Sequence, residues 1–297
     1  MEFKYEFEKD LPIMFQEWTP STMVETFHWH TPLEIGYCHT GKGWFYFGEK
    51  KFRVMPGDVF VVNNMERHIA QSDGDDPSHF SFMYFDPEFI EQGEKELLLP
   101  FVYNPTQFHN HIPAHSPAAK EIGGLLLSME REYRERRTGY KNMLRGGLLQ
   151  ICTLLLRHYG SDTPKSEINR VVNLYHKLNP ALSFMKENFR DPIELEDVAR
   201  VLMLSPSRTR HLFKEMLGEG FKEYLTQLRI NEAKRLLITS DMQVMTICLH
   251  CGFQSLTPFY RAFRQIVGMT PQEYRAEASV LALTRERAMA LSAESDK

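Results

Sequence analysis

Apolar residues recur at helical spacing in the last third of the chain. The first such run has apolar residues at i, i+3, i+4 and i+7, which predicts one buried face of a short helix: Leu195, Val198, Ala199 and Leu202. Ser205 follows as a predicted N-cap and Pro206 as a predicted first residue of the next helix. The outer face of that next helix is polar and basic: Ser207, Arg208, Arg210, His211 and Lys214.

A second helix pair with the same plan begins near residue 244. The inward face of its first helix consists of small and apolar residues: Val244, Ile247, Cys248 and Cys251. Gly252 stands where a left-handed residue ends a helix, Ser255 is a predicted N-cap, and Pro258 lies within the first turn that follows. The outer face of the second helix is again polar: Thr257, Tyr260, Arg261 and Arg264. Two short helices with a basic outer face are what the major groove of DNA accepts.

The first ninety or so residues show a different pattern, with short aromatic and β-branched runs separated by turn residues. Such strands predict a small barrel or sandwich. Helical stripes follow at residues 122–133 and 144–158, and residues 160–166 have the composition of a linker. The fold class expected is therefore α+β, with a β-rich first domain and an all-α second domain.

The charge distribution agrees with this division. Residues 1–164 hold 16 Lys/Arg and 23 Asp/Glu, a net −7, whereas residues 165–275 hold 16 and 12, a net +4. The basic excess falls on the segment expected to contact phosphates.

The helical third of the chain resembles the DNA-binding domain of the AraC/XylS family of bacterial transcription regulators. The residues that carry the resemblance lie in both helix pairs and in the helix between them: Ala199, Ser205, Leu212, Phe213, Lys214, Gly218, Arg229, Ala233, Leu236, Ile247, Gly252, Phe253, Phe259, Arg261, Phe263, Gly268, Thr270, Pro271, Tyr274 and Arg275. The resemblance implies a cytoplasmic homodimer that binds double-stranded promoter DNA and responds to a small-molecule effector. Sugars are common effectors in the family, and activation through RNA polymerase is its commoner output.

On this basis residues 1–160 are expected to form a cupin-like effector-sensing and dimerisation domain. Residues 161–166 are the linker, 167–276 the domain with two helix-turn-helix units, and 277–297 a tail. Arg208, Arg210 and Arg261 are candidates for contacts with base edges, because arginine pairs bidentately with guanine. His211, Thr257 and Tyr260 are expected to add contacts, and Lys214, Arg235 and Arg264 to hold phosphates.

A second resemblance lies within the β-rich domain. His28, His30, Glu34 and Gly41 match the first cupin motif at every spacing, and Pro56-Gly57-Asp58 with His68 resembles the second motif loosely. Residues two apart on a strand share a face, so the residues of the first motif are expected to point into the barrel together.

Three interpretations of these residues stay open. His28, His30, Glu34 and His68 form a set of nitrogen and oxygen ligands suited to Zn, Fe, Mn or Ni. Alternatively, the same residues together with Tyr46 line a metal-free effector pocket, in which case no cofactor is expected. The third possibility is a purely structural core.

The functional alternatives follow from these interpretations. The main hypothesis is an effector-responsive regulator, which is not an enzyme. The alternatives are a metal-sensing regulator, a metal-dependent cupin enzyme fused to a DNA-binding domain, and a regulator whose barrel only dimerises.

Cys248-x-x-Cys251 lies on an apolar helix face without a second cysteine pair, which favours buried small hydrophobes. No apolar run reaches the ~18–20 residues of a membrane helix, and no signal peptide is apparent.

Overall fold

The computed structural model describes residues 7–23, 27–30, 32–63, 66–91, 95–161 and 163–276. The chain forms two compact units, the first running through Leu178 and the second comprising most of the residues from Asn179 on. The first unit contains β-sheets with covering helices, and the second is helical, so the architecture is α+β as expected. The predicted tail, 277–297, lies outside the described residues.

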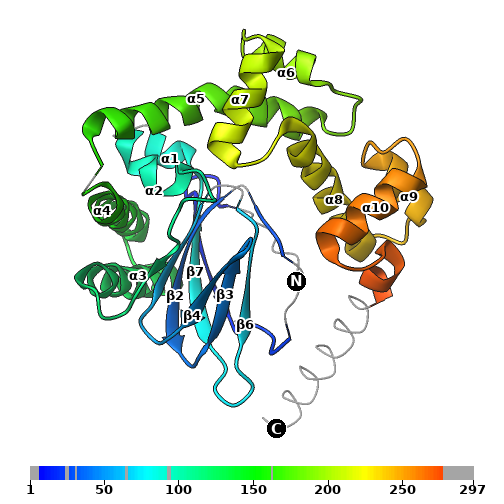
Figure 1. Ribbon diagram of the computed structural model, residues 1–297. Helices are drawn as coiled ribbons and strands as arrows, with labels where there is room; N and C mark the ends of the chain where they lie inside the picture. The colour runs from blue at the N-terminus through cyan, green and yellow to red at the C-terminus, as the bar shows by residue number, and fades with distance from the viewer. Residues whose placement is uncertain are drawn as a thin grey trace. The chain divides into compact units, whose positions relative to one another are not determined.

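Two antiparallel sheets make up the β-structure of the first unit (Figure 1). The five-stranded sheet has, in spatial order, β1 (Ile13–Trp18), β7 (His79–Phe85), β2 (Leu33–Thr40), β5 (Val59–Val62) and β8 (His111–Ile112). The three-stranded sheet has the order β4 (Lys50–Val54), β3 (Gly43–Phe47) and β6 (His68–Ser72).

Alternation along the strands builds the core between the two sheets. On β3 the buried residues Phe45 and Phe47 alternate with the half-buried Trp44 and Tyr46. Their rings meet Phe60, Phe80 and Phe82, which come from the five-stranded sheet and complete a buried aromatic cluster. Glu34 and Cys38, which are four residues apart on β2, face the same interior because alternate residues of a strand share a face.

Helices follow β7, and two of them, α2 (Leu99–Val102) and α3 (Pro117–Glu135), pack against the five-stranded sheet (Figure 1). In chain order the helices are α1 (Glu88–Glu91), the 3-10 turn η1 (Lys95–Leu98), α2, α3 and α4 (Tyr140–Gly160). The hydroxyl of Ser81 donates to Glu130 Oε1 at 2.7 Å, which ties β7 to α3. Gly123 lets α3 approach β2, because a Cβ there would lie 2.6 Å from the ring of Tyr37.

α5 (Lys165–Asn188) begins inside the segment expected to be a linker. The helices that follow are α6 (Leu195–Val201), α7 (Pro206–Leu217), α8 (Phe221–Thr239), α9 (Val244–His250) and α10 (Leu256–Val267). The first half of α8 packs on α7, where Phe213 meets Phe221 and Tyr224. Its second half packs on α9 and α10 through a buried cluster that includes Ile230, Cys248 and Phe263.

The two predicted N-caps behave differently. The hydroxyl of Ser205 accepts a hydrogen bond from the backbone N–H of Arg208 at 3.3 Å, as predicted. Ser255 occupies the predicted N-cap position of α10, but its side chain makes no capping hydrogen bond. The corresponding third helical residue is Pro258, which has no N–H to donate.

The turns between paired helices both contain a residue in the left-handed region. Gly252, between α9 and α10, has φ 86°, as predicted, and Met203, between α6 and α7, has φ 52°. Within the described part of the chain, no helix is long and apolar enough to cross a membrane.

Candidate effector site and DNA-binding surface

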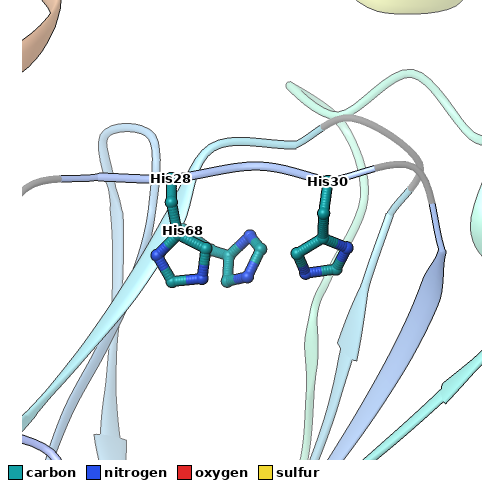
Figure 2. Close-up of side chains that lie close together, drawn as sticks. All are labelled: His28, His30 and His68. Carbon is teal, nitrogen blue, oxygen red and sulfur yellow. The ribbon is translucent and has the colours of Figure 1, made fainter. Parts of the chain in front are cut away.

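Three histidines and one glutamate converge inside the first unit, and we call them the histidine–glutamate cluster: His28, His30, Glu34 and His68. The ring centroids of His28 and His68 are 4.4 Å apart, and those of His30 and His68 are 5.0 Å apart (Figure 2). One nitrogen from each histidine lies within 4.8 Å of the other two. His30, Glu34 and His68 are buried, and His28 is half-buried.

The carboxylate of Glu34 lies between two of the imidazoles. Its Oε2 is 2.6 Å from His30 Nε2 and 3.3 Å from His68 Nε2. The other nitrogen of each ring faces a backbone carbonyl, since His30 Nδ1 is 2.8 Å from Pro32 O and His68 Nδ1 is 2.8 Å from Glu66 O. A carbonyl only accepts hydrogen bonds, so both Nδ1 atoms carry a proton and both Nε2 atoms are turned toward the carboxylate.

The cluster holds its charges in a buried setting. Burial alone would raise the pKa of Glu34, but the charge of His68 and the hydrogen bond with His30 outweigh burial and lower this pKa to about 2. Burial likewise opposes the charged form of His68, yet the charge of Glu34 raises the pKa of that imidazole above its ordinary value. Each of the two groups therefore favours the charged form of the other.

The route by which the sequence brings these residues together differs from the prediction. β2 begins only at Leu33, so His28 and His30 precede the strand and do not share its face by alternation. His28 instead pairs with His68 of β6 through two backbone hydrogen bonds, of 3.1 and 2.9 Å. This backbone pairing places His68, from the segment that resembles the second cupin motif, beside the histidines of the first motif.

Tyr46 is not brought to the cluster. It lies opposite Ile69 across the β3–β6 pair, whereas its neighbour Phe47 lies opposite His68. Tyr46 therefore points away from the interior, and its hydroxyl donates to Gln71 Oε1 at 2.9 Å. The prediction that Tyr46 shares a pocket with the histidines was wrong, because alternation on β3 places it on the other face.

Residues outside the cupin-like motifs complete the surroundings of the cluster. The ring of Tyr84 stands edge-on to His30 with centroids 5.4 Å apart, and Phe47 stacks on His68 at 6.2 Å. The carbonyls of Pro32 and Glu66 orient the two imidazoles. These carbonyls leave no trace in residue type, so no sequence signal identifies them.

The residues expected to bind DNA lie on α7, α8 and α10. All but one are exposed, and Tyr260 is half-buried. Those on α7 are Ser207, Arg208, Arg210, His211 and Lys214; Arg235 is on α8; and those on α10 are Thr257, Tyr260, Arg261 and Arg264.

Several of these side chains already have partners within the chain. Arg235 pairs with Glu232 through two hydrogen bonds of 2.8 and 2.9 Å, and the ammonium of Lys214 donates to Gly218 O at 2.6 Å. The hydroxyl of Tyr260 accepts from the amide of Gln272. By contrast, no acidic side chain in the described residues pairs with Arg208, Arg210 or Arg261.

Cys248 and Cys251 are buried in the core between α8, α9 and α10. Burial raises the pKa of the Cys248 thiol and raises that of Cys251 to about 12. A neutral, buried thiol is a poor metal ligand and nucleophile. The pair therefore acts in packing.

The two units correspond to two known domain types. Residues 12–140 match an AraC-like ligand binding domain, and residues 198–277 match a helix-turn-helix domain. The chain thus joins a ligand-binding domain to a DNA-binding domain.

Relatives and a solved structure agree with these matches. The chain is 24% identical to the melibiose operon regulatory protein of Escherichia coli (strain K12), over 85% of this chain and 84% of that protein. It is 28% identical to the arabinose operon regulatory protein of Salmonella typhimurium (strain LT2), over 80% of each. ToxT from Vibrio cholerae, solved with unsaturated fatty acid bound, has a similar fold, with a TM-score of 0.58 at 13% identity, covering 89% of this chain and 94% of that chain. The chain belongs to the AraC family of transcription regulators.

Proposed function

We propose that this protein is a regulator that binds double-stranded promoter DNA through α7 and α10 in response to a small molecule bound in the first unit. The observation that carries the proposal is a set of exposed arginines that pair with no acidic side chain among the described residues: Arg208 and Arg210 on α7 and Arg261 on α10. An unpaired guanidinium on a helix that fits the major groove is available for bidentate pairing with guanine.

In this proposal, α6–α7 and α9–α10 act as two helix-turn-helix units in residues 167–276. The recognition helices α7 and α10 would enter successive major grooves about one helical turn, ~34 Å, apart. Arg208, Arg210 and Arg261 contact base edges, and His211, Thr257 and Tyr260 add contacts. Lys214, Arg235 and Arg264 contact phosphates, for which Arg235 would have to exchange its pairing with Glu232.

The first unit, residues 1–160, is proposed to sense the effector in a cupin-like barrel formed by the two sheets. The site is the histidine–glutamate cluster, where buried imidazoles and a carboxylate suit the hydroxyl groups of a carbohydrate. The names of the melibiose and arabinose regulators support a sugar. The buried aromatic cluster between the two sheets would supply the apolar part of this effector site.

A homodimer is proposed to form through the helices of the first unit. Leu127 of α3 and Met143 and Leu149 of α4 are exposed. A surface hollow of about 680 Å³ lies on the same two helices, between residues that include Gly124, Leu125 and Leu154. Exposed apolar side chains beside a hollow fit a second copy of this face. The remaining proposals are a cytoplasmic location and activation through RNA polymerase, by analogy with the family.

Replacing Arg210 by alanine is expected to weaken binding to the preferred DNA sequence by about 1–3 kcal/mol, or roughly 5- to 150-fold, and to relax sequence preference. The preferred sequence would first be selected from a random duplex pool with the wild-type chain. Titration of that duplex and of a scrambled duplex then gives both affinities. Arg131→Ala, which removes an exposed arginine from α3 of the first unit, is the matched control. Equal affinity of wild type and Arg210→Ala for the selected site would reject the role of α7.

Replacing Lys214 by alanine is expected to weaken selected and scrambled duplexes to a similar degree. Because one phosphate contact is lost, the slope of log affinity against log salt should become shallower by about 1. The measurement is a salt series from low to moderate ionic strength with both duplexes. A loss confined to the selected sequence would contradict the phosphate assignment.

A further inference from the structure

Two arginines of the second unit, Arg190 and Arg235, share one carboxylate, that of Glu232, and we call them the arginine pair. Glu232 and Arg235 lie on α8, and Arg190 follows the end of α5. Glu232 Oε1 accepts from Arg190 at 2.7 Å and from Arg235 at 2.9 Å, and Glu232 Oε2 accepts from Arg235 Nε at 2.8 Å. An oxyanion held by several guanidinium N–H groups is also the arrangement in which proteins bind phosphate.

The arginine pair carries a surplus of positive charge that solvent can reach. Two guanidinium groups face a single carboxylate. Burial alone would raise the pKa of Glu232, but the hydrogen bonds from Arg235 and Arg190 outweigh burial and lower this pKa, so the carboxylate is ionised at neutral pH. The side chains of Arg190 and Arg235 are 49% and 44% exposed, whereas that of Glu232 is 12% exposed. Both cations are therefore accessible to an anion larger than the carboxylate.

The arginine pair lies beside the turn that leads into α10. The backbone carbonyl of Arg190 contacts this turn, since a Cβ on Gly252 would lie 2.7 Å from it. Besides burial, the charges of Glu232 and of both arginines affect the pKa of the thiol of Cys251, the C-cap residue of α9. α10 begins four residues after Gly252. Because the N-terminal end of a recognition helix contacts base edges, backbone phosphates pass close to this end.

The contact between α5 and α8 does not depend on Arg190. The segment that follows α5 is already tied to α8 by Arg229, whose guanidinium donates to Phe189 O at 2.7 Å and to Asp191 O at 2.8 Å. Arg190 adds an ion pair between partly exposed side chains, and such pairs contribute little to stability. A second cation at this carboxylate is thus more than the packing of the two helices requires.

We propose that the arginine pair binds one phosphate of the DNA backbone and that Glu232 occupies this phosphate site when no DNA is bound. The inference rests on the proposed function of α7 and α10, and it adds Arg190, a residue outside both helix-turn-helix units, to the DNA contacts. The phosphate displaces the carboxylate from the two guanidinium groups. Glu232 therefore lowers the affinity for every duplex to a similar degree and leaves the sequence preference unchanged, because phosphates carry no sequence information.

The first test is Glu232→Gln in the full-length chain. The amide is neutral and keeps the size of the side chain, so both guanidinium groups become available to phosphate. The affinities for the selected and the scrambled duplex should both rise by about 3- to 10-fold near ~0.1 M salt, with an unchanged ratio between them. The slope of log affinity against log salt should become steeper by about 1. A gain in affinity cannot result from poor folding.

Glu223→Gln is the matched control, because it makes the same charge change at an exposed position in the first turn of α8. Its affinities should stay close to those of wild type. Arg190→Ala should act in the opposite direction to Glu232→Gln, with weaker binding of both duplexes and a slope shallower by about 1. In the double variant Glu232→Gln/Arg190→Ala, the gain from Glu232→Gln should be clearly smaller, since only one guanidinium is left to release.

Three outcomes would overturn the inference: equal effects of Glu232→Gln and Glu223→Gln, wild-type affinity in a folded Arg190→Ala chain, or a gain confined to the selected duplex. Each of these outcomes leaves the proposed function standing, because wild type and Arg210→Ala test that function on the same duplexes. A wild-type chain that enriches no sequence from the random pool removes both.

Discussion

Gly252→Ala should destabilise the second unit by roughly 2–5 kcal/mol and abolish DNA binding at ordinary temperature. The left-handed conformation at φ 86° costs a residue with a side chain about 1–2 kcal/mol. A Cβ at this position would also lie 2.7 Å from Arg190 O and 2.8 Å from Phe189 O, and overpacking of this kind adds about 1–3 kcal/mol. Phe189 O cannot withdraw freely, because it accepts from the guanidinium of Arg229 at 2.7 Å.

Gly268→Ala separates these two contributions. Gly268 has nearly the same φ, 87°, but a Cβ there meets no atom of the described residues within 4 Å. This variant should lose only the conformational part, about 1–2 kcal/mol. Urea unfolding of both variants, followed by a probe in the second unit, measures the difference. Equal destabilisation of the two variants would show that the contact with the carbonyls does not matter.

Glu34→Gln should remove an acid-dependent part of the stability of the first unit. Glu34 has its pKa lowered to about 2, from an ordinary value of 4.5, so its contribution is present above pH 4.5 and is lost as the pH falls toward 2. The shift corresponds to roughly 3 kcal/mol for a fully buried group. The raised pKa of His68 acts oppositely, so that its contribution is present below pH 6.5 and is lost as the pH rises through the folded-state value. The ion pair therefore stabilises most between about pH 4.5 and 6.5.

The measurement is the free energy of unfolding in urea from pH 7 to pH 3, with chelator present throughout. Wild type should lose stability relative to Glu34→Gln as the solution is acidified below pH 4.5. Glu49→Gln, an exposed change in the β3–β4 turn, should follow wild type. Parallel pH curves for wild type and Glu34→Gln would contradict the buried ion pair.

Local sequence patterns were sufficient to predict the helices and one turn of the helical unit. The apolar spacing around Val198 and Ile247 predicts the helices, and Gly252 predicts the left-handed turn. The missing side-chain bond at the N-cap Ser255 also has a local cause, since Pro258 has no N–H to donate to it. Capping is predictable only when the third helical residue is considered with the cap itself.

The candidate effector site depended on information that the sequence carries less directly. The spacing of His28, His30 and Glu34 matched a motif, but the same-strand explanation failed because the strand begins at Leu33. The position of His68 follows from a backbone pairing with His28, and pairing between distant segments leaves no periodic signal. Tyr46 was misplaced because both faces of β3 are aromatic, so hydrophobicity does not reveal which face is inward.

The four buried cysteines are divided evenly between the units, with Cys38 and Cys152 in the first and Cys248 and Cys251 in the second. A thiol reagent reacts with a cysteine that is ionised and accessible to solvent. Burial raises the pKa of the thiols of Cys38 and Cys152 and also shields them from the reagent. Alkylation of the folded chain therefore requires transient unfolding of the unit that surrounds the cysteine. The order in which the two cysteine pairs become labelled would rank the opening free energies of the sensor and DNA-binding units within a single molecule.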